Sequence, residues 1–109
     1  MTTIQMEKRP GRFLGYEYHE DIGDGLEGKS VLIPSISIPT KVTCTVNPSG
    51  TAKMQYTTSP LADVEADTAV WQNWPIGDVT VITSDSLVSP VTALRGVSVT
   101  GAVTIDIII

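Results

Sequence analysis

The end of the chain, from Val91 to Ile109, alternates between apolar and polar positions. Strict alternation is typical of a β-strand that has one buried face and one solvent-facing side. Gly101 interrupts the alternation, and glycine can adopt the positive φ that a tight hairpin turn requires. We therefore predict a terminal hairpin of two antiparallel strands, about 91–99 and 102–109, whose odd-numbered residues face the core.

Two residues of this predicted hairpin depart from the alternation. Arg95 has an odd number, so it is predicted to lie on the inward face near a strand end, where its stem packs and its charged head reaches solvent. Ile108 has an even number and is predicted to point out of the sheet. The neighbouring Ile107 and Ile109 are predicted to close the core.

The middle of the chain shows the same kind of pattern. A second hairpin is predicted around the turn residues Asn47 to Gly50, which favour a reversal of the chain. Its inward side chains are predicted to be Val42, Cys44, Val46, Ala52, Met54 and Tyr56.

Less regular segments follow this hairpin. Ser59 and Pro60 predict the start of one or two helical turns. The stretch 69–83 predicts a strand pair broken at 75–78, and 84–90 reads as a loop. Short strands separated by turn residues about every ten positions indicate an all-β fold. We expect an Ig-like or jelly-roll-type antiparallel β-sandwich.

The first part of the chain differs in composition from the rest. Residues 1–30 hold ten charged side chains and residues 31–109 hold nine. We therefore predict an extended N-terminal arm at 1–30 and a β-sandwich domain at 31–109. Phe13, Tyr16 and Tyr18 are candidate anchors with which the arm would order against a partner, whereas a mobile leader is the alternative.

Composition limits the classes of function. The net charge of −5 argues against a nucleic-acid partner, which requires a basic surface. No apolar run reaches the length of a membrane span, and no signal peptide is recognisable, so we expect no membrane association. The single cysteine, Cys44, cannot form an internal disulfide and is predicted to be a buried apolar side chain, as in a reducing cytoplasm.

Candidate catalytic and metal-binding groups are few. His19 is the only histidine, and we interpret it as a solvated surface residue. The stretch Asp21 to Gly28 interleaves carboxylates with glycines but lacks the EF-hand pattern, so a flexible acidic turn is favoured over a weak calcium site. Asp63, Glu65 and Asp67 alternate as carboxylates, and a helical turn would spread them apart. We expect no enzyme activity, no cofactor and no metal.

The two tryptophans have two possible roles, one in the core and one in binding sugars. We predict that Trp71 is the core tryptophan of the sandwich and that Trp74 covers its end. The same two side chains together with Tyr56 would otherwise form a sugar-binding surface.

The stretch from Val42 to Ile107 resembles small structural proteins of tailed bacteriophages. The resemblance rests on the segments TAKMQYTTSP, AVWQNWPIGDVT and SPVTALRGVSVTGAVTI. It implies a virion component made in the host cytoplasm, above all a head decoration (cement) protein that binds the major capsid protein and forms a homo-oligomer on the lattice. A carbohydrate- or receptor-binding module of a tail or fibre is the alternative. Together with the aromatic residues of the predicted arm, the outward Ile108 is a candidate partner-binding residue.

Overall fold

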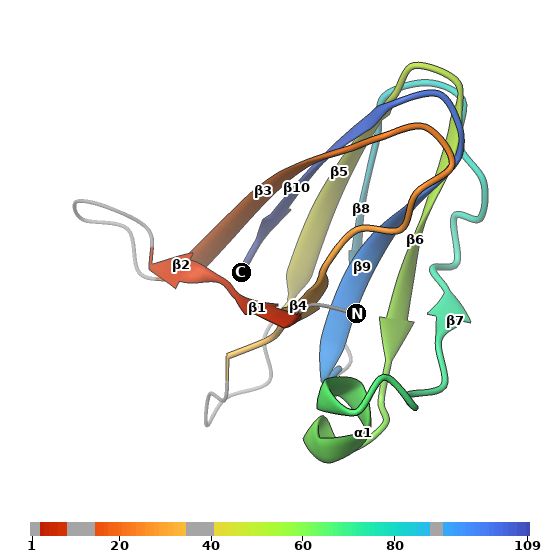
Figure 1. Ribbon diagram of the computed structural model, residues 1–109. Helices are drawn as coiled ribbons and strands as arrows, with labels where there is room; N and C mark the ends of the chain where they lie inside the picture. Colours follow the sequence, from red (N-terminus) through yellow and green to blue (C-terminus); the bar gives the residue numbers. More distant parts are fainter. Residues whose placement is uncertain (1–2, 9–14, 35–40, 88–90) are drawn as a thin grey trace.

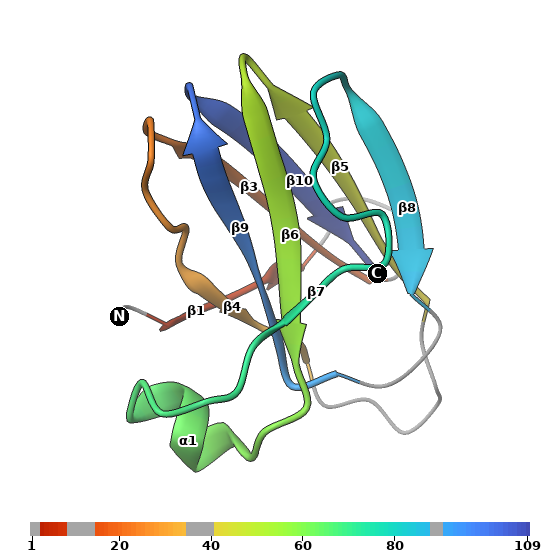
Figure 2. The ribbon, with the colours of Figure 1, turned by 90° about the vertical axis from the view of Figure 1, so that its right-hand side faces the viewer.

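Two five-stranded sheets face each other in the computed structural model, which describes residues 3–8, 15–34, 41–87 and 91–109 (Figures 1 and 2). In spatial order, sheet A comprises β1 (Thr3–Gln5), β4 (Ser30–Leu32), β9 (Ala93–Thr100), β6 (Thr51–Thr57) and β7 (Gln72–Asn73). Sheet B comprises β2 (Glu7–Lys8), β3 (Tyr16–Ile22), β10 (Val103–Ile108), β5 (Val42–Pro48) and β8 (Thr83–Leu87). β1 and β4 run parallel, and the other strand pairs run antiparallel. The predicted all-β sandwich is confirmed.

The two predicted hairpins are wrong, because in each case the turn carries the chain from one sheet to the other. β5 and β6 lie in different sheets, and so do β9 and β10. The two turns lie side by side, where the Ser49 N–H donates to the Ala102 carbonyl at 2.9 Å and the Thr51 N–H donates to Thr100 Oγ1 at 3.2 Å. Gly101 has a φ of 75°, which glycine adopts without strain. The two strands of each predicted hairpin therefore face each other across the core.

The predicted inward parity is confirmed for β10. Val103, Ile105 and Ile107 are buried, whereas Ile108 is 41% exposed on the outer side of sheet B. Cys44 is also buried as predicted, and burial raises the pKa of its thiol to about 12.

For β9 the predicted parity is wrong. Ala93 is buried as predicted, but the even-numbered Leu94 and Ser98 are buried too, and Val99 is 45% exposed. The reason is a close approach between the sheets, since a Cβ on Gly96 would lie 2.8 Å from Ile22 Cδ1 and 3.0 Å from Ile105 Cγ2. Glycine therefore faces inward and leaves room for the opposing isoleucines, while β9 turns its valines outward.

The assignment of the two tryptophans is also reversed. Trp74 is 1% exposed, and its indole N–H donates to Asp85 Oδ2 at 2.9 Å. Tyr56 packs edge-to-face against it, with ring centroids 6.3 Å apart. Trp71 is half-buried, and the Arg95 guanidinium lies 4.3 Å from its ring centroid. The half-buried Asp85 satisfies the indole N–H of Trp74, so this tryptophan can enter the core without leaving a donor unpaired.

The segment predicted as a loop from residue 84 contains most of β8. Strand β8 pairs with β5, and hydroxyl groups link the two strands: Thr45 with Ser84 at 2.8 Å and Thr43 with Ser86 at 3.0 Å. β8 is held by these cross-strand hydroxyl pairs and not by alternating apolar side chains. The sequence therefore lacks the alternation that would predict a strand. The predicted strand pair at 69–83 is wrong, because its second half forms no strand before β8 begins at Thr83, and Val79 makes only an isolated bridge with Ala52.

The short helix predicted after Pro60 is confirmed as α1 (Leu61–Glu65). Ser59 does not cap it, since its hydroxyl accepts a hydrogen bond from the Val70 N–H at 3.0 Å instead. In the part of the chain that the structure describes, no helix has the length and apolar character needed to cross a membrane.

The N-terminal segment is part of the sandwich in its described residues, 3–8 and 15–30, which corrects the predicted division at residue 30. β3 pairs with β10 from Glu17 to Ile22, and β1 pairs with β4. Met6 and Ile22 are buried in the shared core. These buried side chains and strand pairings hold the charge-rich N-terminal strands in the sandwich, while their charged side chains face solvent. Phe13 lies outside the described residues.

The reversed tryptophan assignment predicts a split in stability. Trp74→Ala should lower the free energy of unfolding by about 3–5 kcal/mol, because it leaves a cavity and an unpaired Asp85. Trp71→Ala should cost no more than about 1–2 kcal/mol, since its ring is half-buried on the outer side. Chemical denaturation of both variants measures the difference, and equal costs would contradict the assignment.

Candidate interaction surfaces

Ile108 is a large aliphatic side chain in a polar setting on the outer face of sheet B. Ile108 stands in register with Glu17 on β3 and Thr43 on β5. Thr43 is tied to Ser86, so the flank on that side is a fixed array of hydroxyl groups. An exposed isoleucine on a rigid central strand offers apolar area to a partner at little cost in conformational entropy.

Beside Ile108, His19 of β3 forms a charge-assisted pair across to β10. His19 Nδ1 lies 2.6 Å from Asp106 Oδ1, and Nε2 lies 3.6 Å from Asp21 Oδ1. The hydrogen bond to Asp106 and the charge of that carboxylate raise the pKa of His19 above its ordinary value of 6.5. The imidazole is exposed, and its contact with Asp106 links β3 to β10 at the surface.

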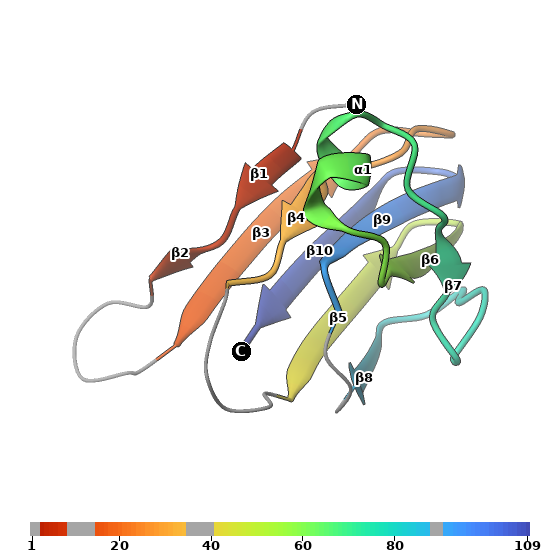
Figure 3. The ribbon, with the colours of Figure 1, turned by 90° about the horizontal axis from the view of Figure 1, so that it is seen from below.

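Among the described residues, no strand pairs with the outer edge of β3 beyond Glu17. β2 pairs with β3 at Glu7–Glu17 and Lys8–Tyr16, and β1, which precedes β2 in the chain (Figure 3), belongs to sheet A. A cavity of about 630 Å³ lies along this edge. Its lining residues are Ile4, Glu7, Glu17, Tyr18, His19, Glu20, Asp21, Lys29, Asp106, Ile107 and Ile108.

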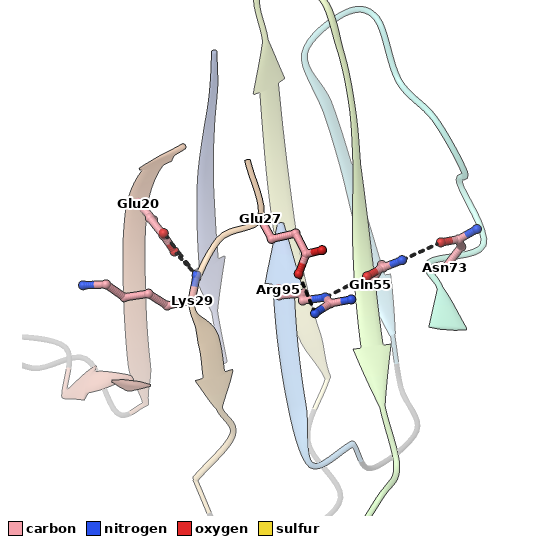
Figure 4. A network of polar contacts seen from close by, with 6 residues as sticks. All are labelled: Glu20, Glu27, Lys29, Gln55, Asn73 and Arg95. Carbon is pink, nitrogen blue, oxygen red and sulfur yellow. Dashed lines mark hydrogen bonds and ion pairs between the residues drawn. The ribbon is translucent and has the colours of Figure 1, made fainter. Parts of the chain in front are cut away.

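Carboxylates dominate the lining of this cavity, which we name the β3 groove. Five acidic residues stand against Lys29 and His19: Glu7, Glu17, Glu20, Asp21 and Asp106. Glu20 is occupied internally, because it accepts hydrogen bonds from the Lys29 N–H at 3.2 Å and the Tyr18 hydroxyl at 3.0 Å. Lys29, Glu20 and their contact are drawn in Figure 4. The other four carboxylates are exposed and give the groove a negative field.

The predicted anchors Tyr16 and Tyr18 face the core side of sheet B. Both are half-buried and pack against the hydrophobic core. Burial, followed by the hydrogen bond to Glu20, raises the pKa of Tyr18. Their contact with a partner stays a prediction, as does that of Ile108, which the structure places on the surface.

The acidic stretch Asp21 to Gly28 uses its carboxylates separately. Asp21 accepts from the Thr104 hydroxyl at 2.8 Å, and Asp24 accepts from the Gly101 N–H at 2.6 Å. Glu27 pairs with Arg95 at 2.9 Å. Within residues 3–8, 15–34, 41–87 and 91–109, no three or more His, Cys, Asp or Glu side chains gather where a metal ion could be held.

The outer face of sheet A carries a row of hydrogen-bonded polar side chains. Glu27, Arg95, Gln55 and Asn73 follow one another across the sheet (Figure 4), with Arg95 Nε donating to Gln55 Oε1 at 2.7 Å and Gln55 Nε2 donating to Asn73 Oδ1 at 3.0 Å. Arg95 was predicted to face inward; it lies here instead, 12% exposed, and burial lowers its pKa against the opposing charge of Glu27. Trp71 covers the Arg95 guanidinium, and the polar groups of the row bond mainly to one another. The row therefore stabilises sheet A.

The sequence reasoning missed the groove because its residues meet only through strand register. Glu7 and Glu17 are ordinary surface positions in the sequence, and the pairing of β2 with β3 sets them directly opposite each other. No family model matches the chain, and a search of curated proteins finds no significant match.

The His19–Asp106 pair predicts a pH dependence of stability. Because the pKa of His19 is raised in the folded state, its stabilising contribution is complete below about pH 6.5 and is lost as the pH rises through the folded-state pKa. His19→Gln should therefore lower the melting temperature at pH 5.5 relative to the parent protein, with the difference shrinking by pH 8. A difference that does not change with pH would contradict this role of the pair.

Proposed function

We propose that the protein is a non-enzymatic structural component of a bacteriophage virion, a capsid decoration protein that binds the major capsid protein lattice and associates with further copies of itself there. The resemblance of Val42 to Ile107 to phage structural proteins supports this proposal. The rigid two-sheet scaffold, with most polar side chains engaged in internal hydrogen bonds, is compatible with a binding role. Synthesis in the host cytoplasm followed by assembly into the particle is part of the proposal.

The observation that carries the proposal is the exposed Ile108 on the central strand of sheet B. β10 is hydrogen-bonded to β3 and β5 on both sides, so Ile108 is held in place without a partner. Covering such a side chain on binding removes apolar surface from water, worth about 25 cal/mol per Å². Its polar surroundings resemble the arrangement of an apolar contact within a polar rim.

Co-sedimentation with capsids of the phage that encodes the chain tests the proposal. Ile108→Ser should weaken capsid binding by about tenfold or more, because it replaces an apolar contact with a hydroxyl group that needs a partner. The melting temperature of the isolated protein should stay nearly unchanged, since Ile108 faces away from the core.

Val70→Ser is the matched control, because Val70 is 70% exposed and lies outside sheet B. It should leave capsid binding as it is. Equal binding by the parent protein and Ile108→Ser, or no sedimentation of the parent protein with capsids, would overturn the proposal.

Carbohydrate binding by a tail or fibre module is the second candidate, and Trp71 favours it. Trp71 lies at the outer face of sheet A near Gln55 and Asn73, whose amide groups are of the kind that bind sugar hydroxyls. Trp74, by contrast, is buried and cannot stack on a sugar. A calorimetric titration with glycans that yields binding in the parent protein and none in Trp71→Ala would support this candidate over capsid decoration.

A further inference from the structure

We propose that the β3 groove binds an extended, lysine- or arginine-bearing segment of a partner protein, which adds as a strand to the open edge of β3. The inference rests on the proposed function and deepens it, because it states the chemistry of the partner segment. It combines three observations: backbone groups on the β3 edge that no strand of the described residues pairs with, carboxylates around that edge, and the repulsive pair of Glu7 and Glu17 where β2 begins.

The backbone groups follow from the register of β3. The Ile109 N–H donates to the Tyr16 carbonyl at 3.0 Å, so the even-numbered residues of β3 direct their backbone groups toward β10. Successive residues of a strand direct these groups to opposite edges. His19 and Asp21 therefore present N–H and C=O groups to the other edge, which β2 covers only as far as Glu17.

Negative charges are in excess around this edge. Glu7, Glu17, Asp21 and Asp106 are exposed in the groove, and the cationic groups of its lining are Lys29 and, when protonated, His19. Complementary charge steers a basic partner toward such a surface and disfavours an acidic one. A second copy of this chain, with its net charge of −5, fits the groove less well than a basic segment.

The clearest sign is the pair formed by Glu7 and Glu17. They stand directly opposite each other on β2 and β3, and both are exposed. Like charges in directly opposed positions destabilise a sheet. A lysine or arginine of a partner segment that passes along the edge of β3 would lie beside both carboxylates and remove this repulsion, while Ile4 and Ile108 supply apolar contacts at the same site.

Main-chain pairing would give the interaction its geometry. An added strand gains affinity from backbone hydrogen bonds and specificity from alternate side chains. With alternate residues directed toward the outer face of sheet B, basic side chains at every second position would reach the carboxylates. The segment would then end where β3 turns into the loop after Ile22.

A titration of the purified full-length protein with a short capped peptide that alternates lysine and valine tests the inference. Binding should be measurable by calorimetry at low salt and should weaken as salt is added. The same peptide with glutamate in place of lysine, and a lysine peptide with methylated backbone amides, should both fail to bind. Binding of the methylated peptide with undiminished affinity would overturn strand addition.

Glu7→Lys is the decisive variant. It converts the repulsive pair into an attractive one, so the melting temperature should rise or stay level, whereas peptide affinity should fall by about tenfold or more. Asp78→Lys is the matched control, because it makes the same change of charge at an exposed position outside the groove, and it should bind like the parent protein.

Each contrary outcome is distinct. Unchanged affinity in Glu7→Lys, or no binding of the lysine peptide by the parent protein, would overturn the inference and leave the acidic edge as protection against aggregation. Dimerisation of the parent protein that Glu7→Lys abolishes, without peptide binding, would assign the groove to a second copy and also overturn it. Capsid binding that survives Glu7→Lys but is lost in Ile108→Ser would overturn this inference alone and leave the proposed function standing.

Discussion

The packing of β10 against sheet A is the constraint on which the rest of the structure depends. β10 lies between β3 and β5, and its Ile105 enters the space that Gly96 leaves on the opposing sheet. Since successive residues of a strand point to opposite faces, burial of Ile105 and Ile107 fixes Asp106 and Ile108 on the outside. The same register places His19 beside Asp106 and Glu17 beside Ile108.

The connections between the sheets explain why the surface has its particular form. β1 and β2 are separated in sequence only by Met6 but belong to different sheets, so β2 covers one end of the β3 edge and β1 lies away from that edge in sheet A. That departure opens the β3 groove. On the other side of the sandwich, the polar row around Arg95 braces sheet A and engages its own side chains. Sheet B consequently carries its exposed Ile108 beside an acidic edge.

The sequence predicts the fold class and the strongest strands because their alternation reports a single buried face. β10 and β5 follow this rule, and Ile108 is assigned correctly from its position alone. β9 does not, since the small residue at Gly96 is buried for reasons of space that only the opposing Ile22 and Ile105 reveal. The hairpins fail for a related reason: a turn sequence is the same whether the chain returns to its own sheet or crosses to the other.

The candidate surfaces were only partly accessible from the sequence. The indole N–H of Trp74 is satisfied in the core by Asp85. No pattern in the sequence indicates that these two side chains meet. The N-terminal strands were mistaken for an arm because their charged residues face solvent while Met6 and Ile22 enter the core. The groove itself depends on register, so Glu7 and Glu17 carry no sign of their pairing until β2 is placed beside β3.

Amide hydrogen exchange, resolved by residue and measured with and without the proposed partner, the major capsid protein, tests the central claim most directly. Our account predicts that the amides of His19 and Asp21, which face the open edge, exchange rapidly in the free protein and become protected in the complex, together with the surroundings of Ile108. The amides around Trp71 and Gln55 should not change. Protection confined to sheet A, with His19 and Asp21 exchanging as fast as before, would contradict the account.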